Sequence, residues 1–264
     1  MKSILILLIS LLLFRCNKKQ SEEVIKEEQK ELIEPTKPEE TELYEPVPPS
    51  VSPKGQNGVP SDAMVLFDGS NLDEWEMAYG NDEVTWILND DDKSMTVHRT
   101  DGVKNATIQT KKVFGSVQLH MEWKSPEEIK GDGQHRGNSG VFLQGTYEVQ
   151  ILDNNDNDTY VNGQVGAIYK QSVPLAKASV PTGEWNTYDI IYHAPEFNEL
   201  GEKTKSATIT VLHNGVLIQD HFEIKGSTEY IGWPNNSAHG KAPIKLQDHG
   251  DAVSYRNIWV RELD

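Results

Sequence analysis

The stretch FGSVQLHMEW, residues Phe114–Trp123, decides the fold class. Its side chains alternate in character: Val117, Leu119, Met121 and Trp123 fall on one face, and Gln118, His120 and Glu122 on the other. A period of two is that of a β-strand with one face buried, because successive side chains of a strand point to opposite sides. The stretch therefore predicts a strand that lies on a hydrophobic core.

Shorter apolar runs flank this strand on both sides and are separated by Gly, Pro, Asn and Asp. We expect them to form strands at Val84–Leu88, Ser94–His98, Ala106–Gln109, Gly140–Gln144, Tyr147–Leu152, Val165–Tyr169, Thr187–His193, Ala207–His213, Val216–Asp220, Ile244–Gln247 and Tyr255–Arg261. Asn214-Gly215 predicts a hairpin, since both residues tolerate positive φ. Without a long helical period, about a dozen short strands predict an all-β sandwich or jelly roll of two antiparallel sheets.

Composition excludes several classes of protein. The chain has 264 residues and a formal net charge of −16, so it should repel nucleic acid, and we expect no such partner. A hydrophobic fraction of 36% and a mean hydropathy of −0.57 do not fit a membrane protein with several spans. The single cysteine, Cys16, permits no disulfide within one chain and no cysteine-based zinc site.

The N-terminus has the pattern of a targeting segment. The apolar run from Ile4 to Phe14 has the length of a signal-peptide core and is too short to span a bilayer. Cys16 directly after it resembles the lipidated cysteine of a bacterial lipoprotein, although Phe14 and Arg15 are larger than the residues usual before that cysteine. We expect a signal peptide at 1–15 and a lipid anchor at Cys16, with a plain secretory signal as the alternative. Both predict export to the cell envelope.

Residues 16–60 are rich in Glu, Lys and Pro and contain few apolar side chains. Such a segment buries too little surface to offset its ordering entropy. We therefore expect a disordered tether that precedes one β-sandwich domain at 61–264.

The same alternation assigns polar side chains to the outer faces of strands. Glu148 and Gln150 alternate with core positions of one strand, and Lys245, Gln247 and His249 do so near another. His193 ends a third strand on the face opposite its tyrosines. Polar residues at such positions usually form a solvated face, but long titratable and amide side chains are also typical of a binding face.

Gly131–Gly140, GDGQHRGNSG, is the most loop-like part of the domain. Its glycines would let the backbone approach a ligand, and His135, Arg136 and Asn138 could donate hydrogen bonds to sugar hydroxyls. A flexible connection between strands is the alternative. A phosphate loop is excluded, because the Gly-Lys-Ser/Thr ending is absent.

Metal binding is left open by the sequence. Asp153–Asp158 has Asp and Asn at alternating positions, as a calcium loop does, but Asp158 and Gln164 stand where an EF-hand requires Gly and Glu. A polar turn is the simpler interpretation. No His-Glu-x-x-His spacing occurs, yet separated histidines could converge with carboxylates, so a divalent metal, Ca²⁺ or a transition metal, is not excluded.

The carboxylates near Glu148 do not match the pattern that ordinary glycoside hydrolysis requires. Sandwich glycosidases of the laminarinase type carry Glu-x-Asp-x-x-Glu on an inner strand, and Glu148–Asp153 has Gln150 at the middle position and the shorter Asp153 at the last. A retaining hydrolase needs two carboxyl groups about 5 Å apart. Residues five apart in a regular strand face opposite sides.

Six blocks in order resemble the 3-keto-disaccharide hydrolase domain family, whose members are also described as 3-keto-glycoside 1,2-lyases and 2-hydroxy-glucal hydratases. The resemblance covers residues 62–264 and rests on Leu66–Glu76, Gly137–Asn154, Gly163–Tyr169, Gly183–Phe197, Val211–His221 and Pro243–Leu263. It implies a concanavalin-like jelly roll. It also implies a glycoside oxidised at C3, supplied by a glycoside 3-dehydrogenase as functional partner.

The resemblance implies a chemistry without a carboxylate pair: a base removes the acidified C2 proton, the aglycone leaves C1, and water adds back. On this basis we assign Glu148 as the base and His249 or His239 as the acid. Asp153 and Asp248 would orient the catalytic groups. The remaining candidates would bind the sugar: Arg136, Asn138, Gln150, His193, Lys245 and Gln247.

The sequence is also compatible with two other classes of protein. A non-catalytic surface module could bind carbohydrate on the same face, with Trp75, Trp86, Trp185 or Trp233 as stacking platforms, although tryptophan in a sandwich is more often buried. A structural adhesin on a proline-rich stalk is the third interpretation, which the His- and Gln-bearing strands do not favour.

Overall fold

The computed structural model describes residues 34–55, 58–80 and 83–263. It divides the chain into two units, Met1–Ser50 and Val51–Asp264. In the first unit, the described residues 34–50 are exposed and contain one short 3₁₀ helix, η1 (Pro38–Thr41). The predicted signal peptide and Cys16 lie outside the described residues. None of the helices described is long and apolar enough to cross a membrane.

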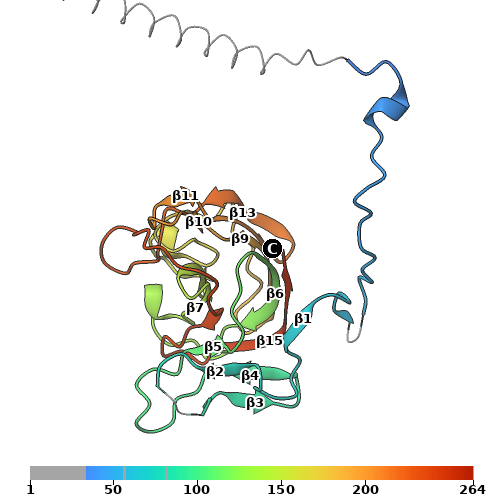
Figure 1. The fold of residues 1–264 in the computed structure, drawn as a ribbon. Coiled ribbons are helices and arrows are strands. Elements are labelled where there is room, and N and C mark those ends of the chain that lie inside the picture. Colours follow the sequence, from blue (N-terminus) through green and yellow to red (C-terminus); the bar gives the residue numbers. More distant parts are fainter. Residues whose placement is uncertain (1–33, 56–57, 81–82, 264) are drawn as a thin grey trace, which may run out of the picture. The chain divides into compact units, whose positions relative to one another are not determined.

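The larger sheet of the second unit has eight strands, and all its pairs are antiparallel (Figure 1). Its order is β13 (Val216–Glu223), β12 (Thr208–His213), β9 (Asn186–His193), β6 (Val117–Lys124), β15 (Ser254–Glu262), β4 (Ser94–Thr96) and β3 (Ile87–Asn89), with β1 (Met64–Phe67) also paired to β15. Strand β6 is the stretch that decided the fold class, and it lies near the centre of this sheet.

The second sheet has five antiparallel strands in the order β2 (Trp75–Met77), β5 (Ile108–Thr110), β14 (Lys245–Leu246), β7 (Ser139–Leu143) and β8 (Tyr147–Ile151). A small separate pair joins β10 (Glu196–Phe197) to β11 (Lys203–Lys205). Two short 3₁₀ helices, η3 (Gly133–His135) and η4 (Val161–Gly163), lie in the connections. The architecture confirms the predicted all-β jelly-roll sandwich.

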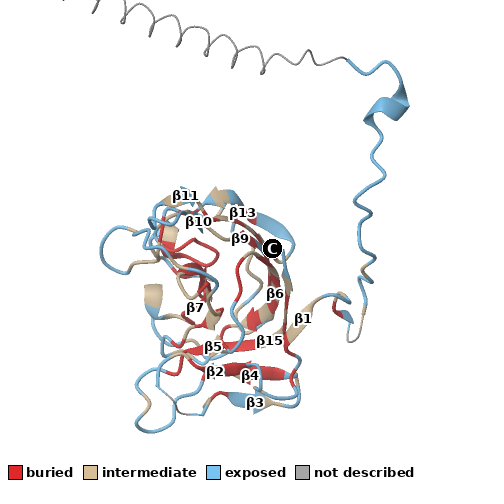
Figure 2. Cartoon of the chain, in the orientation of Figure 1, coloured by how far each residue is buried: buried red, intermediate tan, exposed pale blue. Residues whose placement is uncertain are grey.

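The core lies between the inner faces of the two sheets (Figure 2). Along β6, buried and partly exposed residues alternate without a break, as the sequence predicts. Leu119 and Met121 of the large sheet and Val141 and Val149 of the small sheet all belong to one buried cluster. Each such side chain contributes roughly 1.5–3 kcal/mol by leaving water, so the shared cluster holds the two sheets together.

The predicted strand at Val165–Tyr169 is wrong. Gly166 has a φ of 79°, which breaks the regular extended backbone, and the segment makes only isolated bridges, from Ile168 to Val149 and to Ser172. It still hydrogen-bonds along β8: the Gln150 N–H donates to Ala167 O at 3.0 Å, and the Gly166 N–H donates to Gln150 O at 2.9 Å. The segment therefore covers the open edge of β8, a strand whose five residues are all buried.

Candidate functional site

A cleft of about 470 Å³ opens on the outer face of the five-stranded sheet. Its floor comes from β7, β8 and the residues after β14, where side chains alternate with the core residues Val141 and Val149. The residues that line it are Gln134, His135, Asn138, Phe142, Glu148, Gln150, Tyr160, Tyr169, Lys170, Thr228, Tyr230, Gln247 and His249. The structure thus brings together six residues that the sequence indicated: His135, Asn138, Glu148, Gln150, Gln247 and His249.

Glu148 is the buried acid of this cleft, with only 5% of its surface exposed. On the neighbouring strand, Gly140 leaves the space in which its carboxyl group lies: a Cβ at Gly140 would come within 2.4 Å of Glu148 Oε1. Among the described residues, no cation or hydrogen-bond donor contacts this carboxyl group. Burial therefore raises the pKa of Glu148 to about 8, because the charged form loses its hydration without a compensating partner.

Two amide side chains beside Glu148 carry buried oxygens without donors. The Gln150 Nε2 group donates to Gln134 Oε1 at 3.0 Å, while Gln150 Oε1 accepts no hydrogen bond from the described residues. Gln247 Oε1 is also buried and accepts no hydrogen bond from the described residues. Leaving a buried acceptor unpaired costs about 1–3 kcal/mol, so the two oxygens are matched to donors from a bound ligand such as sugar hydroxyls.

His249 lies at the accessible side of the cleft. Partial burial lowers its pKa, and the neighbouring His135 acts in the same direction, whereas Asp251 and Asp248 oppose the shift. At neutral pH the ring is therefore uncharged, with one nitrogen free to accept a proton. The cleft thus places an uncharged carboxylic acid and a neutral imidazole together.

Asp248, next to His249, points away from the cleft and holds the chain in place. Burial alone would raise its pKa, but hydrogen bonds from the Arg99 guanidinium and from the N–H groups of Ala106 (2.6 Å) and Gly250 (2.9 Å) hold that pKa below its ordinary value. Asp248 is thus an ionised anchor that fixes the backbone on which Gln247 and His249 stand, consistent with the predicted orienting role.

An aromatic wall on one side of the cleft was not found from the sequence. Tyr160 and Tyr169 share a hydrogen bond between their hydroxyl groups at 2.6 Å. Lys170 Nζ lies 4.6 Å from the ring centre of Tyr230 and donates to Tyr230 O at 2.5 Å. These residues come from irregular segments without periodicity. The sequence indicates Tyr169 only through a resemblance block and a predicted strand that the structure does not contain, and neither gives the direction of its side chain.

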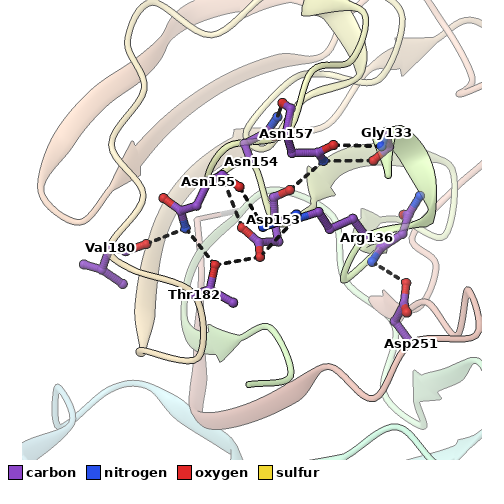
Figure 3. A network of polar contacts seen from close by, with 10 residues as sticks. Gly133, Arg136, Asp153, Asn154, Asn155, Asn157, Val180, Thr182 and Asp251 are labelled. Atoms are coloured by element: carbon purple, nitrogen blue, oxygen red, sulfur yellow. Dashed lines mark hydrogen bonds and ion pairs between the residues drawn. The ribbon is translucent and has the colours of Figure 1, made fainter. Parts of the chain in front are cut away.

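Asp153 and Arg136 lie behind the cleft, in a network that ties three loops together (Figure 3). Asp153 accepts hydrogen bonds from the Asn155 N–H at 2.9 Å and the Thr182 hydroxyl at 2.8 Å, and its carboxylate lies 3.4 Å from Arg136 Nε. Arg136 also donates to Asn155 O at 2.8 Å. Neither Asp153 nor Arg136 lines the cleft, so a direct catalytic or sugar-binding role has no support from this geometry.

The Asp153–Asp158 loop is likewise a hub of hydrogen bonds. Asn157 Oδ1 accepts from the Gly133 N–H at 2.7 Å, and the Asn155 amide donates to Val180 O at 2.9 Å, so these groups face protein donors and acceptors rather than an open ligand position (Figure 3). Within the part of the chain that the structure describes, no three His, Cys, Asp or Glu side chains gather in a way that could hold a metal ion.

Three further predicted residues are not brought to the cleft. His193 is exposed at the end of β9, on the outer face of the other sheet, opposite Thr208. His239 hydrogen-bonds through Nε2 to the Tyr147 hydroxyl at 2.7 Å, on the core side of β8. Lys245 lies on the face of β14 opposite the core, as predicted. Its Nζ, however, is 5.8 Å from the ring centre of Tyr79, and Lys245 does not line the cleft.

A smaller cleft of about 280 Å³ lies beside β15, on the other sheet. Arg256 pairs there with Glu122 at 2.7 Å, and Asp92 pairs with Lys124 at 3.1 Å. Hydrogen bonds lower the pKa of Asp68, and at Asp92 the effect of burial, which would raise the pKa, is outweighed by hydrogen bonds that lower it. The described lining of this cleft contains no unpaired buried amide. The chemistry therefore concentrates in the larger cleft.

Known structures share this fold. A crystal structure of a candidate glycosyl hydrolase from Parabacteroides distasonis is 50% identical, with a TM-score of 0.79 over 86% of this chain and 97% of that chain. A second candidate glycosyl hydrolase from the same organism is 21% identical, with a TM-score of 0.57 over 77% and 94% of the two chains, and shares the fold.

Sequence comparison identifies the family. A Bacteroides thetaiotaomicron protein named 3-keto-disaccharide hydrolase is 27% identical over 256 residues, which is 78% of this chain and 81% of that protein. The family model of the 3-keto-alpha-glucoside-1,2-lyase-like domain matches residues 62–261, nearly the whole compact unit. The predicted family is confirmed: the chain belongs to the 3-keto-disaccharide hydrolase, or 3-keto-α-glucoside-1,2-lyase-like, family.

Proposed function

We propose that this protein is a glycoside-processing enzyme that cleaves 3-keto-glycosides by 1,2-elimination followed by hydration. Family membership supports the substrate class. The observation that carries the proposal is the cleft itself, in which the buried acid Glu148 lies with His249 and two unpaired amide oxygens. A non-catalytic sugar-binding module has no use for a buried, uncharged carboxyl group.

The environments of Glu148 and His249 favour roles opposite to those expected from the sequence. A group that is protonated at neutral pH is ready to act as an acid, and a neutral imidazole is ready to act as a base. Glu148, with a pKa of about 8, holds its proton, while the pKa of His249 is lowered. We therefore assign Glu148 as the acid that protonates the leaving group and His249 as the base that takes the C2 proton.

The steps balance without an outside reagent. The ketone at C3 acidifies the C2–H bond, and His249 takes this proton while the electron pair moves into an enolate. The enolate expels the glycosidic oxygen from C1, and Glu148 delivers a proton to that oxygen. A C1=C2 enone remains. Water then adds its oxygen to C1 and gives a proton to the Glu148 carboxylate, while His249 returns a proton to C2. Both side chains regain their starting states, and the net result is hydrolysis.

The rest of the cleft would bind and stabilise these species. The unpaired oxygens of Gln150 and Gln247 can accept hydrogen bonds from sugar hydroxyls. Lys170 can donate to an oxygen that gains negative charge, such as that of the enolate, and so can whichever hydroxyl group of the Tyr160–Tyr169 pair accepts their shared hydrogen bond. The acceptors and donors lie in the lining of one cleft, as the binding of a polar, flat ring requires.

The leaving group offers the sharpest test of the two roles. A 4-nitrophenyl 3-keto-glucoside needs little acid assistance, whereas a methyl 3-keto-glucoside needs much. With Glu148 as acid, Glu148→Gln should lose about 10²–10⁴-fold in kcat/KM on the methyl substrate and far less on the nitrophenyl substrate. His249→Asn should lose activity on both.

His193→Asn is the matched control, since His193 is an exposed histidine on the other sheet, and it should leave both rates unchanged. Equal losses for Glu148→Gln on the two substrates would contradict the acid role. No turnover of either substrate by the wild-type protein, with retained affinity for plain glycans, would refute the enzyme and favour the binding module.

We also propose that the protein is exported and anchored to a membrane through lipid on Cys16, where a glycoside 3-dehydrogenase supplies its substrate. The N-terminal sequence supports the anchor, and the need for a C3 ketone supports the partner. Labelling of cells with a fatty-acid probe should mark the wild-type protein and not Cys16→Ser. Labelling of both, or of neither, would refute the anchor.

A further inference from the structure

A second cavity of about 400 Å³ adjoins the catalytic cleft. The two share one wall, made of Tyr160, Tyr169 and Lys170. Beyond that wall the second cavity is lined by Asn162, Gln171, Glu229, Gly232, Trp233 and Pro234. A ligand that fills the catalytic cleft could therefore continue across the shared wall into the second cavity.

The second cavity has an aromatic surface that folding does not explain. Trp233 is 91% exposed, whereas Trp75 and Trp86 are 2% and 4% exposed. Tyr230, at the edge of the catalytic cleft on the same loop, is 74% exposed. The flat face of an exposed indole or phenol ring stacks well on the apolar face of a sugar ring, while hydroxyl groups at the rim of that sugar need polar partners.

The loop that carries these rings is held at its base. The Ser227 N–H donates to Asn235 O at 2.9 Å, and Glu229 Oε1 accepts from the Ser227 hydroxyl at 2.7 Å and the Asn235 amide at 2.9 Å. A Cβ on Gly226 would lie 2.3 Å from Asn235 O, so the two ends of the loop approach as closely as a glycine permits. The loop therefore presents Tyr230–Pro234 from a fixed base.

The lining also matches the polar rim of a sugar. Lys170 carries a positive charge between the two cavities, and Glu229, Asn162 and Gln171 add a carboxylate and two amides around the aromatic rings. Glu229 and Gln171 also hydrogen-bond within the base of the loop, so Lys170 and Asn162 are the lining groups with the most capacity for a ligand. A pyranose ring uses both kinds of surface.

We propose that the second cavity is a subsite for a second pyranose ring, the part of a disaccharide that leaves when the 3-keto-glycoside is cleaved. The subsite stacks this ring on Trp233 across the wall formed by Tyr160 and Tyr169. The assignment of this ring as the leaving group rests on the proposed function. The stacking itself does not, so binding alone can test it.

The test is a binding titration of the full domain with unoxidised sugars, followed by isothermal calorimetry or tryptophan fluorescence. The probes are cellobiose and maltose, each compared with methyl β- or α-glucoside. At least one disaccharide should bind about fivefold to tenfold more tightly than its methyl glucoside, as expected for one stacked ring. Trp233→Ala should remove this preference and leave the affinity for the methyl glucoside unchanged.

Ile231→Ala is the matched control, because Ile231 is 83% exposed on the same loop and lines neither cavity. It should keep the disaccharide preference. Equal affinities for disaccharide and methyl glucoside in the wild type, or an unchanged preference in Trp233→Ala, would overturn the subsite. A disaccharide preference without turnover of 3-keto-glycosides would refute the proposed function and leave the subsite standing.

Discussion

Replacing Glu148 by glutamine should stabilise the protein at alkaline pH. The side chain is buried without a charge partner, and its pKa is about 8 in the folded protein against an ordinary value of 4.5. The folded state therefore binds its proton more tightly than the unfolded state. The contribution of Glu148 to the free energy of unfolding is fully present at low pH and is lost as the pH rises from about 5 to 8. In this range the folded protein must either keep the Glu148 carboxyl group protonated or bury its negative charge.

The size of the effect follows from these two values. One pKa unit corresponds to about 1.4 kcal/mol, so between pH 5 and pH 9 Glu148 should cost the wild type about 4 kcal/mol of unfolding free energy. The substituted glutamine side chain would have nearly the shape of the protonated acid and cannot ionise. The Glu148→Gln variant should therefore match the wild type within about 1 kcal/mol at pH 5 and exceed it by about 2–4 kcal/mol at pH 9.

Urea unfolding of both proteins at several pH values between 5 and 9 measures this difference. Subtracting the wild type from the variant removes the contribution of every other titrating group. A difference that stays constant with pH would refute the reasoning, because it would mean that the carboxyl group is ionised in the folded protein at neutral pH.

Three further predictions concern a buried histidine of the large sheet, the packing around Glu148 and the loop network behind the cleft. Burial lowers the pKa of His213 to about 4, so the free energy of unfolding should fall by about 3 kcal/mol as the pH drops from 6.5 to 4. NMR titration of the ring should give a midpoint near 4, and a midpoint above 6 would contradict this prediction. Gly140→Ala should displace the Glu148 carboxyl group and reduce kcat at least about tenfold with little change in unfolding free energy, and unaltered kcat would refute the packing argument. Asp153→Ala should cost about 3 kcal/mol of unfolding free energy, because it removes the carboxylate beside Arg136, and a loss below about 1 kcal/mol would show that the loop network does not depend on it.

The alternation of apolar and polar residues with a period of two is the sequence signal that predicts the strands and part of the site. It identified most strands of both sheets but not β1 or β2, and it placed Glu148, Gln150 and Gln247 on an outer face. The same rule misplaced His193 because it assigns a side chain to one face of a strand without saying which sheet that strand joins. The pairing of β9 with β12 determines that β9 belongs to the larger sheet. Such long-range pairing cannot be inferred from the local sequence pattern.

The rest of the site depends on irregular segments. Tyr160, Lys170 and Tyr230 come together because loops fold over the edge of β8, and loops have no periodicity from which a side-chain direction can be inferred. The acid and base roles were also inaccessible, since they depend on burial: the same sequence motif would leave Glu148 an ordinary carboxylate on an open strand. Three-dimensional packing supplies this information.

The central claim is that the glycosidic bond breaks by elimination across C1 and C2, and deuterium incorporation tests it most directly. A 3-keto-glucoside is turned over in D₂O, and the 3-keto-glucose product is analysed at once by mass spectrometry and NMR, with an enzyme-free sample as the blank for spontaneous exchange. The account predicts one deuterium at C2 in each product molecule. The proton on the exposed His249 ring exchanges with D₂O before C2 is protonated again, so cleavage that retains the original C2 hydrogen would contradict the account.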